Sequence, residues 1–438
     1  MSKKKPIRVS TAAAAFGGVH TVVTDRETGD VMTWDGESRW VRGSRELFAL
    51  IADWAEDNAR DEVNPCPPVW CRGVASFCSA DALKRKIRFD SQPYLLALGN
   101  YQMRVDVFDL RTGERRPAQP NDRVEMLLGE CPDEKFETPV WNSFLDHVTL
   151  EREDLRRYLL RLAGYTLCGM PREEIIILLK GEGGNGKGIF LRVLSELMGE
   201  HSIQVAPDFF KPTAVFRHTT ELADLHNRRL IVQPEAAEGQ WVVQRVKMLA
   251  GGDGTLRARR MREDQTDITL MGVPWFGVNH TPSLEGGLAM ARRLRVLPFD
   301  YQPAKPDVTL KQRLRKEYRG ILHQLVQEAI VYLEDGLPPV PECVTEESKA
   351  FMRDASPPLD RWLAERTERD LEAEERFNDL AEDMKKWFED NGYKRAPTHQ
   401  RFGAFLRDRG FRSQRRGRSK KSFRLGLRLV TEEEPLPF

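Results

Sequence analysis

The sequence has 438 residues, of which 40% are hydrophobic and 31% are charged, and its formal net charge is +1. At roughly 100 to 200 residues per domain, this length predicts two to four compact units and excludes a single small module. No run of about 18 apolar residues and no secretory h-region is present, so we expect a cytoplasmic protein with no membrane partner. The six cysteines form no CxxC pair, which agrees with a reducing compartment.

Residues 1–140 are typical of a mixed α+β domain. Short strand-like pieces alternate with turns, and apolar residues at helical spacing predict one helix over Glu46–Ala59. Residues 141–170 change to a helical pattern, with apolar residues gathered on one face between Leu155 and Ala163. We expect this second segment to be a helical linker or collar.

Residues 171–302 alternate short, strongly apolar runs with polar helical stretches. The runs Ile175–Leu179, Leu230–Val232 and Trp275–Val278 are too short for helices and apolar enough to be buried on both faces. Interior parallel strands have this composition, so the segment predicts an α/β domain with a parallel sheet. Residues 303–355 then predict a helical extension.

Residues 356–438 predict a winged helix-turn-helix domain. An amphipathic helix is expected from Phe377, with Asn391 and Gly392 as its stop signal, and a second helix is capped by Thr398. A basic loop and a half-buried strand over Phe423–Leu429 complete the order. Residues 393–430 hold thirteen basic residues and one acidic residue, and this local charge of +12 is typical of a polyanion-binding surface.

A glycine-rich segment directly follows the first apolar run of the central region and precedes a helical pattern. Strand, glycine-rich loop and helix start is the context that a phosphate-binding P-loop requires. Glycines let successive backbone N–H groups converge on phosphate oxygens, the helix N-terminus adds positive potential, and Lys187 supplies a charge for the β- and γ-phosphates of ATP. The predicted nucleotide-binding residues are Gly181, Gly183, Gly184, Asn185, Gly186, Lys187, Gly188 and Ile189. The alternative is a glycine-rich surface turn.

The residue after the lysine departs from the usual P-loop pattern. This position normally carries a Ser or Thr hydroxyl that binds Mg²⁺, and here it is Gly188. Three explanations stay open. A water replaces the hydroxyl, another residue holds the metal, or the site is degenerate and does not hydrolyse its nucleotide.

Two polar residues follow the other two apolar runs of the central region. Glu235 stands just past the second run, where a carboxylate can hold the Mg²⁺ water shell and orient an attacking water. Asn279 ends the third run, where an amide can contact the γ-phosphate or the same water. The alternatives are an ordinary surface acid and a turn former.

Arg292 and Arg293 precede a further apolar run, Leu294–Phe299. An arginine at this point can reach the phosphate of a neighbouring subunit, as an arginine finger does, and this role requires a ring of subunits. The alternative is a surface ion pair. The predicted catalytic residues are therefore Lys187, Glu235, Asn279, Arg292 and Arg293, with Glu235 also the predicted metal ligand.

These four elements, in this order, resemble the motifs of superfamily 3 helicases of the phage and plasmid primase-helicase type. The resembling segments are Arg228–Val232 leading to Glu235, Lys247–Asp253, Asn279–Pro282, and Arg292–Leu294 closing at Pro298–Phe299. Such proteins form hexameric AAA+-type rings that hydrolyse ATP with Mg²⁺ and translocate on single-stranded DNA. The resemblance therefore implies a P-loop AAA+-type core, a homohexamer, and a channel-lining role for Lys247, Arg257 and Arg259, whose charges suit contacts with the DNA backbone.

The leading hypothesis is an ATP-dependent replicative DNA helicase of a phage, plasmid or other mobile element, which loads on origin DNA through its winged helix. The candidate DNA-binding residues of that domain are Arg401, Arg407, Arg415, Arg416, Arg418, Lys420 and Lys421. The N-terminal region is too short for an attached primase domain, so we expect primers from a separate primase. The alternative is a nucleotide-gated DNA-binding replication initiator or regulator without unwinding activity.

Overall fold

The computed structural model describes residues 8–35, 39–58, 68–99, 105–212, 218–251, 255–259, 265–284, 290–393, 395–416 and 421–430. The chain divides into two compact units, which are described separately below. One unit consists of Met1–Thr281 and Ala289–Lys349, and the other of Pro282–Leu288 and Ala350–Phe438. Among the helices in the described ranges, none is long and apolar enough to cross a membrane.

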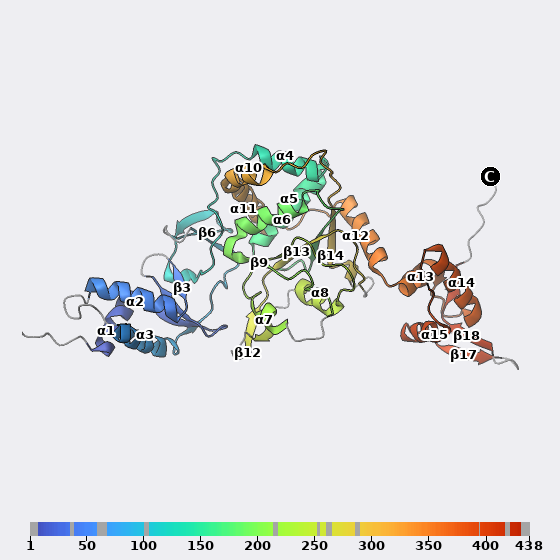
Figure 1. The fold of residues 1–438 in the computed structure, drawn as a ribbon, viewed down its shortest axis with the longest axis horizontal. Coiled ribbons are helices and arrows are strands. Elements are labelled where there is room, and N and C mark those ends of the chain that lie inside the picture. Colours follow the sequence, from blue (N-terminus) through green and yellow to red (C-terminus); the bar gives the residue numbers. More distant parts are fainter. Residues whose placement is uncertain are drawn as a thin grey trace, which may run out of the picture. The chain divides into compact units, whose positions relative to one another are not determined.

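The first unit begins with helices packed on a small sheet (Figure 1). The helices are α1 (Val9–Val19), α2 (Ser44–Asn58) and α3 (Pro68–Ala82), and the sheet has the order β3 (Trp40–Arg42), β2 (Val31–Trp34), β1 (Val22–Asp25), β4 (Lys86–Ile87). Leu47, Ile51 and Ala55 recur every four residues along α2 and are fully buried, so the predicted helix is confirmed. The helices α1 and α3 were not predicted, because their alanine-, glycine- and cysteine-rich sequences carry only a weak periodic pattern.

A second small sheet and a pair of helices lead to the centre of this unit. The sheet is antiparallel and contains β5 (Leu95–Leu98), β6 (Asp106–Asp109) and β7 (Glu114–Pro117), followed by a 3₁₀ turn at Pro120–Asp122. The helices α4 (Pro139–Val148) and α5 (Glu153–Leu167) come next, and α5 packs against α11 (Tyr318–Asp335), which follows α10 (Leu310–Lys316). Gly164 permits this close packing, because a Cβ atom there would lie 2.6 Å from the backbone nitrogen of Ala329.

A five-stranded parallel sheet forms the centre of the first unit. Its order is β14 (Leu294–Pro298), β8 (Ile176–Lys180), β13 (Val273–Val278), β10 (Leu230–Gln233), β9 (Ser202–Gln204). Nearly every residue of β8, β10 and β13 is buried, which confirms the predicted interior strands and the α/β class.

Helices cover both faces of this sheet. In Figure 1, α4, α5, α6 (Lys187–Met198), α10 and α11 lie on one side, while α7 (His218–Ala223), α8 (Val243–Ala250) and the hairpin of β11 (Thr255–Arg259) and β12 (Gln265–Thr269) lie on the other. A 3₁₀ turn at Gly199–His201 connects α6 to β9. Side chains of the sheet, of α5, α6 and α11 share one continuous core.

The main part of the second unit begins at Ala350, within α12 (Glu342–Ala355). Its elements are α13 (Pro358–Arg366), α14 (Phe377–Asp390) and α15 (His399–Asp408), a sheet of order β16 (Glu374–Arg376), β18 (Lys421–Leu425), β17 (Ser413–Arg416), and the pair β15 (Thr367–Glu368) and β19 (Arg428–Leu429). Leu380 and Met384 of α14 pack with Phe402 of α15 in its core. The hydroxyl of Thr398 accepts a hydrogen bond from the backbone N–H of Arg401, so the predicted cap is confirmed.

The strand predicted over Phe423–Leu429 is wrong in its extent. Gly426 has a φ angle of +83°, in the left-handed region that glycine favours, and the chain turns there between β18 and β19. The two parts pair with different partners, β16 and β17 for the first and β15 for the second. The alternation of apolar and polar residues continues through the turn, so the pattern gave no sign of the break.

Candidate nucleotide site

The predicted P-loop connects the carboxyl end of β8 to the amino end of α6. Gly183, Gly184 and Gly186 have φ angles of +96°, +66° and +93°, which glycine adopts without strain. Gly186 is the N-cap of α6, so the backbone N–H groups of Lys187 and Gly188, the first two of that helix, have no carbonyl partner in a preceding helical turn. Strand, loop and helix thus follow one another in the order that phosphate binding requires.

Lys187 begins α6 and is almost entirely buried inside the loop. Its Nζ donates to the carbonyl oxygen of Gly181 at 2.7 Å and to Oδ1 of Asn185 at 3.0 Å. Asn185 in turn donates from Nδ2 to the carbonyl oxygen of Phe299 at 2.5 Å, which ties the loop to the segment after β14. Burial lowers the pKa of Lys187 to about 8, and the charge of Glu235 opposes that shift.

The strand order brings Glu235 and Asn279 to the edge of the sheet that carries the P-loop. The strand β13 lies between β8 and β10, and all three are parallel, so their carboxyl ends meet there. Asn279 donates from Nδ2 to Oε1 of Glu235 at 3.3 Å. Gly277 allows the approach of the two strand ends, because a Cβ atom there would lie 2.0 Å from the carbonyl oxygen of Pro234.

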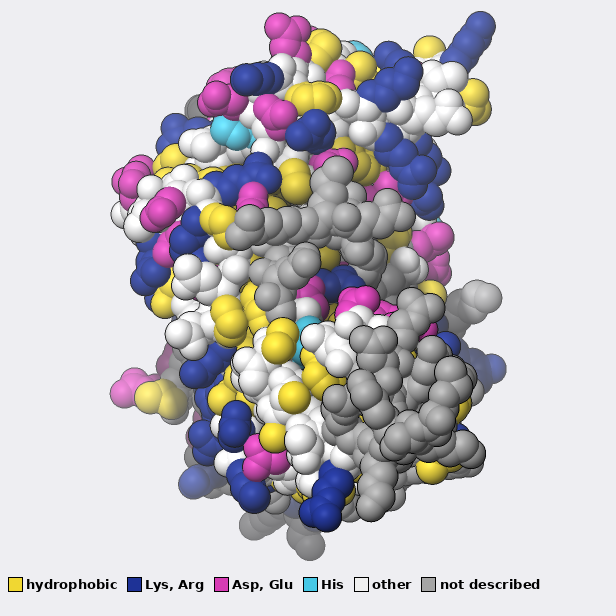
Figure 2. Space-filling view, turned by 90° about the vertical axis from the view of Figure 1, so that its left-hand side faces the viewer, with side chains coloured by type: hydrophobic (Ala, Val, Ile, Leu, Met, Phe, Trp, Pro, Cys, Tyr) yellow, Lys and Arg dark blue, Asp and Glu magenta, His cyan; other side chains and the backbone are white. Residues whose placement is uncertain are grey.

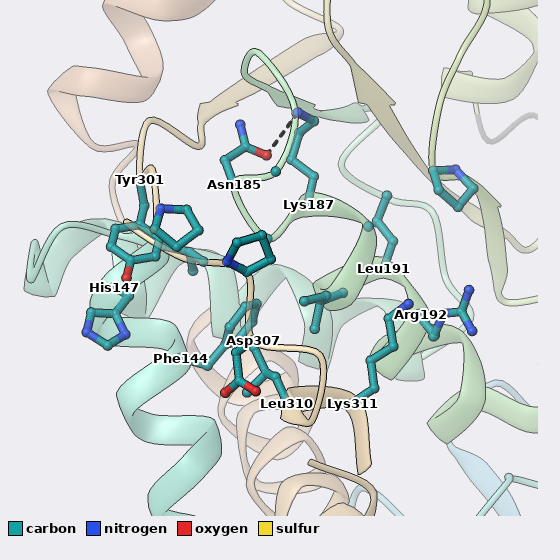
Figure 3. A pocket seen from close by; sticks show the side chains of 18 of the residues that line it. Phe144, His147, Asn185, Lys187, Leu191, Arg192, Tyr301, Asp307, Leu310 and Lys311 are labelled. Atoms are coloured by element: carbon teal, nitrogen blue, oxygen red, sulfur yellow. Dashed lines mark hydrogen bonds between the residues drawn. The ribbon is translucent and has the colours of Figure 1, made fainter. Parts of the chain in front are cut away.

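A cavity of about 920 Å³ opens at this edge of the sheet. The P-loop residues Gly183–Ile189 line it together with Glu235 and Asn279. The other walls come from α4, from α6 and from residues 301–313, which follow β14 (Figure 3). The volume lies in the range of small-molecule binding sites. Of the predicted nucleotide-binding residues, only Gly181 lies outside the lining, where its carbonyl oxygen holds Lys187.

Sequence reasoning missed the walls that α4 and residues 301–313 contribute. Phe144, His147, Tyr301 and Asp307 are among them. Glu235 was identified because it stands just past the carboxyl end of a buried strand. Tyr301 stands in the same position relative to β14, so the same rule would also have identified it. Phe144 gave no signal, because an apolar side chain on a helix predicts a core face and not a ligand.

The predicted arginine pair lies near the amino ends of the parallel strands, opposite the carboxyl ends that carry the P-loop. Arg292 and Arg293 stand in the turn before β14, at the amino end of that strand, whereas the P-loop follows the carboxyl end of the parallel neighbour β8. Arg292 is exposed. Arg293 accepts a backbone hydrogen bond from Ile176 at 2.7 Å, and its Nη2 lies 3.7 Å from Oε2 of Glu174. Neither arginine lines the cavity of its own chain.

The candidate DNA-binding residues of the first unit lie on elements between β10 and β13. Lys247 is exposed in the last turn of α8. Arg257 and Arg259 belong to β11, where they pair in register with Asp267 and Gln265 of β12. Figure 2 shows another face, the left-hand side of Figure 1 where α1, α2 and α3 lie, and there Lys and Arg side chains are interspersed with Asp and Glu.

The candidate DNA-binding residues of the second unit lie on α15 and on the hairpin β17–β18. Arg401 and Arg407 of α15 and Arg415 of β17 are exposed. Arg416 and Lys421 are paired backbone positions in the register of the hairpin. Arg418 and Lys420 lie outside the described residues.

Some arginine side chains of the second unit form hydrogen bonds or ion pairs within that unit. Arg424 is buried, donates to the carbonyl oxygen of Gly403 at 3.2 Å, and lies 5.1 Å from the centre of the Phe377 ring. Burial lowers the pKa of this guanidinium. Arg409 pairs with Asp360 at 2.6 Å. The local charge of +12 counted from the sequence therefore overstates the charge that is available to a polyanion.

Comparison with known proteins gives one family match and a distant viral relative. Residues 179–293, from β8 to the arginine pair, match a family described as "Family of unknown function (DUF5906)". The chain is 27% identical over 229 residues to "Putative helicase L207/L206" of Acanthamoeba polyphaga mimivirus. The aligned part is 48% of this chain and 22% of the viral protein, so it spans about a fifth of that relative.

Solved structures show a likeness in fold. "The A form apo structure of NrS-1 C terminal region-CTR(305-718)" gives a TM-score of 0.51 at 11% identity, covering 97% of this chain and 100% of that one. "The apo structure of NrS-1 C terminal region (305-718)" gives 0.49 at 11% identity, covering 97% and 99%. The protein is thus a distant relative of a viral protein named as a helicase, and it shares its fold with the NrS-1 C terminal region.

Proposed function

We propose that this protein is an ATP-dependent DNA helicase of the superfamily 3 type, which serves the replication of a phage, plasmid or other mobile element. One observation carries the proposal. Lys187, Glu235 and Asn279 line one cavity at the carboxyl ends of adjacent parallel strands, although they are far apart in the sequence. The distant viral relative named as a helicase supports the nucleic-acid part of the proposal.

In this proposal the P-loop holds the nucleotide, and Glu235 and Asn279 act on the attacking water. The loop N–H groups and Lys187 bind the β- and γ-phosphates. Glu235 accepts a proton from the water whose oxygen attacks the γ-phosphorus, the bond from that phosphorus to the β–γ bridging oxygen breaks, and ADP and phosphate leave. The hydrogen bond from Asn279 orients the carboxylate of Glu235 for this step.

The residues around the P-loop fit a magnesium ion that is bound mainly through the nucleotide. Within the part of the chain that the structure describes, no group of three or more His, Cys, Asp and Glu side chains is arranged to hold a metal. Mg²⁺ commonly keeps several waters together with phosphate oxygens, and Glu235, which lines the cavity with the P-loop, would hold that water shell. When bound, the ion neutralises charge on the phosphates.

The position of Arg292 and Arg293 supports a ring of subunits. Both lie at the amino edge of the sheet, so within one chain they stand on the side away from the cavity. We therefore assign them to the nucleotide of an adjacent subunit, as arginine fingers that stabilise charge in the transition state. A closed homohexamer of AAA+-type subunits meets this requirement.

Two surfaces are proposed to contact DNA. Lys247 and the hairpin that carries Arg257 and Arg259 would line the central channel and hold the phosphates of a single strand. In the second unit, α14, α15 and the hairpin β17–β18 have the order of a winged helix, which would place α15 on origin DNA. A separate primase would supply the primers.

A second candidate function is a nucleotide-gated DNA-binding initiator or regulator that does not unwind DNA. Gly188 favours it, because this position offers no hydroxyl to the metal. Nucleotide binding in such a protein would drive assembly without turnover.

Unwinding of a forked DNA duplex separates the two functions. The helicase is expected to hydrolyse ATP faster with single-stranded DNA and to unwind the fork, and Lys187→Ala is expected to abolish both activities. Lys316→Ala, which removes an exposed lysine outside the cavity, is the matched control and should behave as the wild type. ATP-dependent binding of DNA without turnover would support the initiator, and unwinding by Lys187→Ala would refute the motor.

A further inference from the structure

We infer that the end of the cavity away from Lys187 holds the nucleobase, and that His147 and Tyr301 form the stacking platform for it. The site would then select nucleoside triphosphates over inorganic polyphosphates. This inference rests on the proposed function, because it takes the P-loop as the binding site for the phosphates. It adds the residues that recognise the rest of the substrate.

The two rings come from different elements and lie parallel to each other. His147 belongs to the last turn of α4 and Tyr301 follows β14, yet their ring centroids are 4.9 Å apart with an interplanar angle of 13°. Both residues line the cavity. Figure 3 shows them next to each other at the left of the view, with Lys187 further to the right and Asn185 between. His147 is exposed and Tyr301 is partly exposed, so ring surface remains accessible to a ligand.

Apolar side chains connect this platform to the P-loop. A Cβ atom at Gly186 would lie 2.8 Å from Cγ1 of Val148 and 3.0 Å from Cε2 of Phe144, so α4 packs directly against the loop. Leu310 adds a further apolar wall to the same cavity. A ligand whose phosphates are bound at the P-loop and which extends along α4 would therefore meet apolar and aromatic side chains over the length of that helix.

The character of this surface identifies the class of ligand. A polyphosphate gains nothing from aromatic and aliphatic walls, whereas the flat face of a purine or pyrimidine stacks on aromatic rings. Stacking tolerates different bases because every base has a π-face, so we expect discrimination among bases to be small. A purely structural role is less consistent with His147, since its side chain is exposed and not part of a core.

Binding of ATP and of inorganic tripolyphosphate, measured by calorimetry at the same Mg²⁺ concentration, tests the platform. Tripolyphosphate carries the phosphates without the base, so it reports on the P-loop alone. We expect Tyr301→Ala and His147→Ala each to weaken ATP binding by about fivefold to a hundredfold and to change tripolyphosphate binding by less than about twofold. Tyr301→Phe keeps the ring and should keep the affinity for ATP. Val308→Ala, at a residue that is 86% exposed in the same segment and outside the lining, should match the wild type.

Failure of the stacking platform and failure of the phosphate site would give different results. Equal weakening of both ligands by the alanine variants, or unchanged binding of ATP, would overturn the platform while leaving the P-loop intact. If Lys187→Ala left the affinity for both ligands unchanged, the phosphate site itself would be wrong, and the proposed function would fall together with this inference.

Discussion

Gly188 is the residue at which the P-loop departs from its usual composition, and its surroundings leave room for a larger side chain. A Cβ atom there would meet nothing within 4 Å, and its φ angle lies outside the left-handed region. We expect Gly188→Thr to place a hydroxyl where P-loops bind Mg²⁺, and so to lower the Mg²⁺ concentration for half-maximal ATP hydrolysis by roughly threefold to tenfold. A magnesium titration of the ATPase rate measures the effect.

The control for this substitution is Gly188→Ala, which adds a Cβ atom without an oxygen. Its magnesium requirement should equal that of the wild type, since nothing in it can bind the ion. Identical titrations for the threonine and alanine variants would show that position 188 does not face the metal, and another group would then have to supply the missing ligand.

Lys187 should make nucleotide binding depend on pH. Its pKa of about 8 in the free protein means that the amine is mostly charged at neutral pH and mostly neutral above pH 8. A bound triphosphate favours the charged form, so the affinity for ATP should be nearly constant below pH 8 and should fall above it, by at most about tenfold per pH unit. Calorimetric titrations between pH 7 and 10 measure this. Lys187→Met should bind weakly at every pH, and a flat wild-type profile would contradict the assignment.

At the scale of elements, the helices, strands and loops that could be predicted are those with a clear pattern in a short stretch of sequence. The strands β8, β10 and β13 are short apolar runs because both of their faces are buried, and the P-loop is contiguous in the sequence. The helices α1, α3 and α13 were missed. Their sequences are too uniform or too short to show a helical period, and tertiary packing stabilises them.

The hydrogen bond between Asn279 and Glu235 could not be predicted from spacing, although both residues were expected at the phosphate site. Glu235 and Asn279 are 44 residues apart and meet because β13 lies beside β10 in the sheet. The stacking of His147 on Tyr301 joins a helix before the sheet to a segment after it, and neither residue type signals the other. Arg424 shows the converse error, because a charge count treats a buried arginine as a surface charge.

The packing of α5 against α11 depends on a glycine and gives a test of the fold. At Gly164 a Cβ atom would lie 2.6 Å from backbone atoms of α11, so neither helix can accept a methyl group without moving. We expect Gly164→Ala to destabilise the protein by about 1–3 kcal/mol and to lower its melting temperature, although alanine is the better helix former. Gly188→Ala, also a helical glycine but with open space around it, should leave the melting temperature unchanged or slightly higher. Equal shifts for both variants would contradict the packing argument.

At the scale of the whole molecule, the two ends of the parallel strands carry different groups of the predicted site residues. The carboxyl edge carries the cavity with the P-loop, and the amino edge carries Arg292 and Arg293. Residues on opposite edges of one sheet cannot act on the same nucleotide, but they can meet when one copy of the chain packs against the next. A function that needs both edges is therefore a property of the assembly and not of a single chain.

Mixing two inactive variants tests whether catalysis is completed between subunits. Lys187→Ala keeps the arginines and loses the phosphate site, whereas the double variant Arg292→Ala/Arg293→Ala keeps the phosphate site and loses the arginines. Each protein alone is expected to be inactive in DNA-stimulated ATP hydrolysis. In a ring assembled from an equal mixture, about a quarter of the interfaces would combine an intact phosphate site with an intact arginine pair, so part of the activity should return. Size-exclusion chromatography must show that both variants still assemble. A mixture no more active than its separate components, with assembly preserved, would mean that the arginines do not complete a neighbour's site.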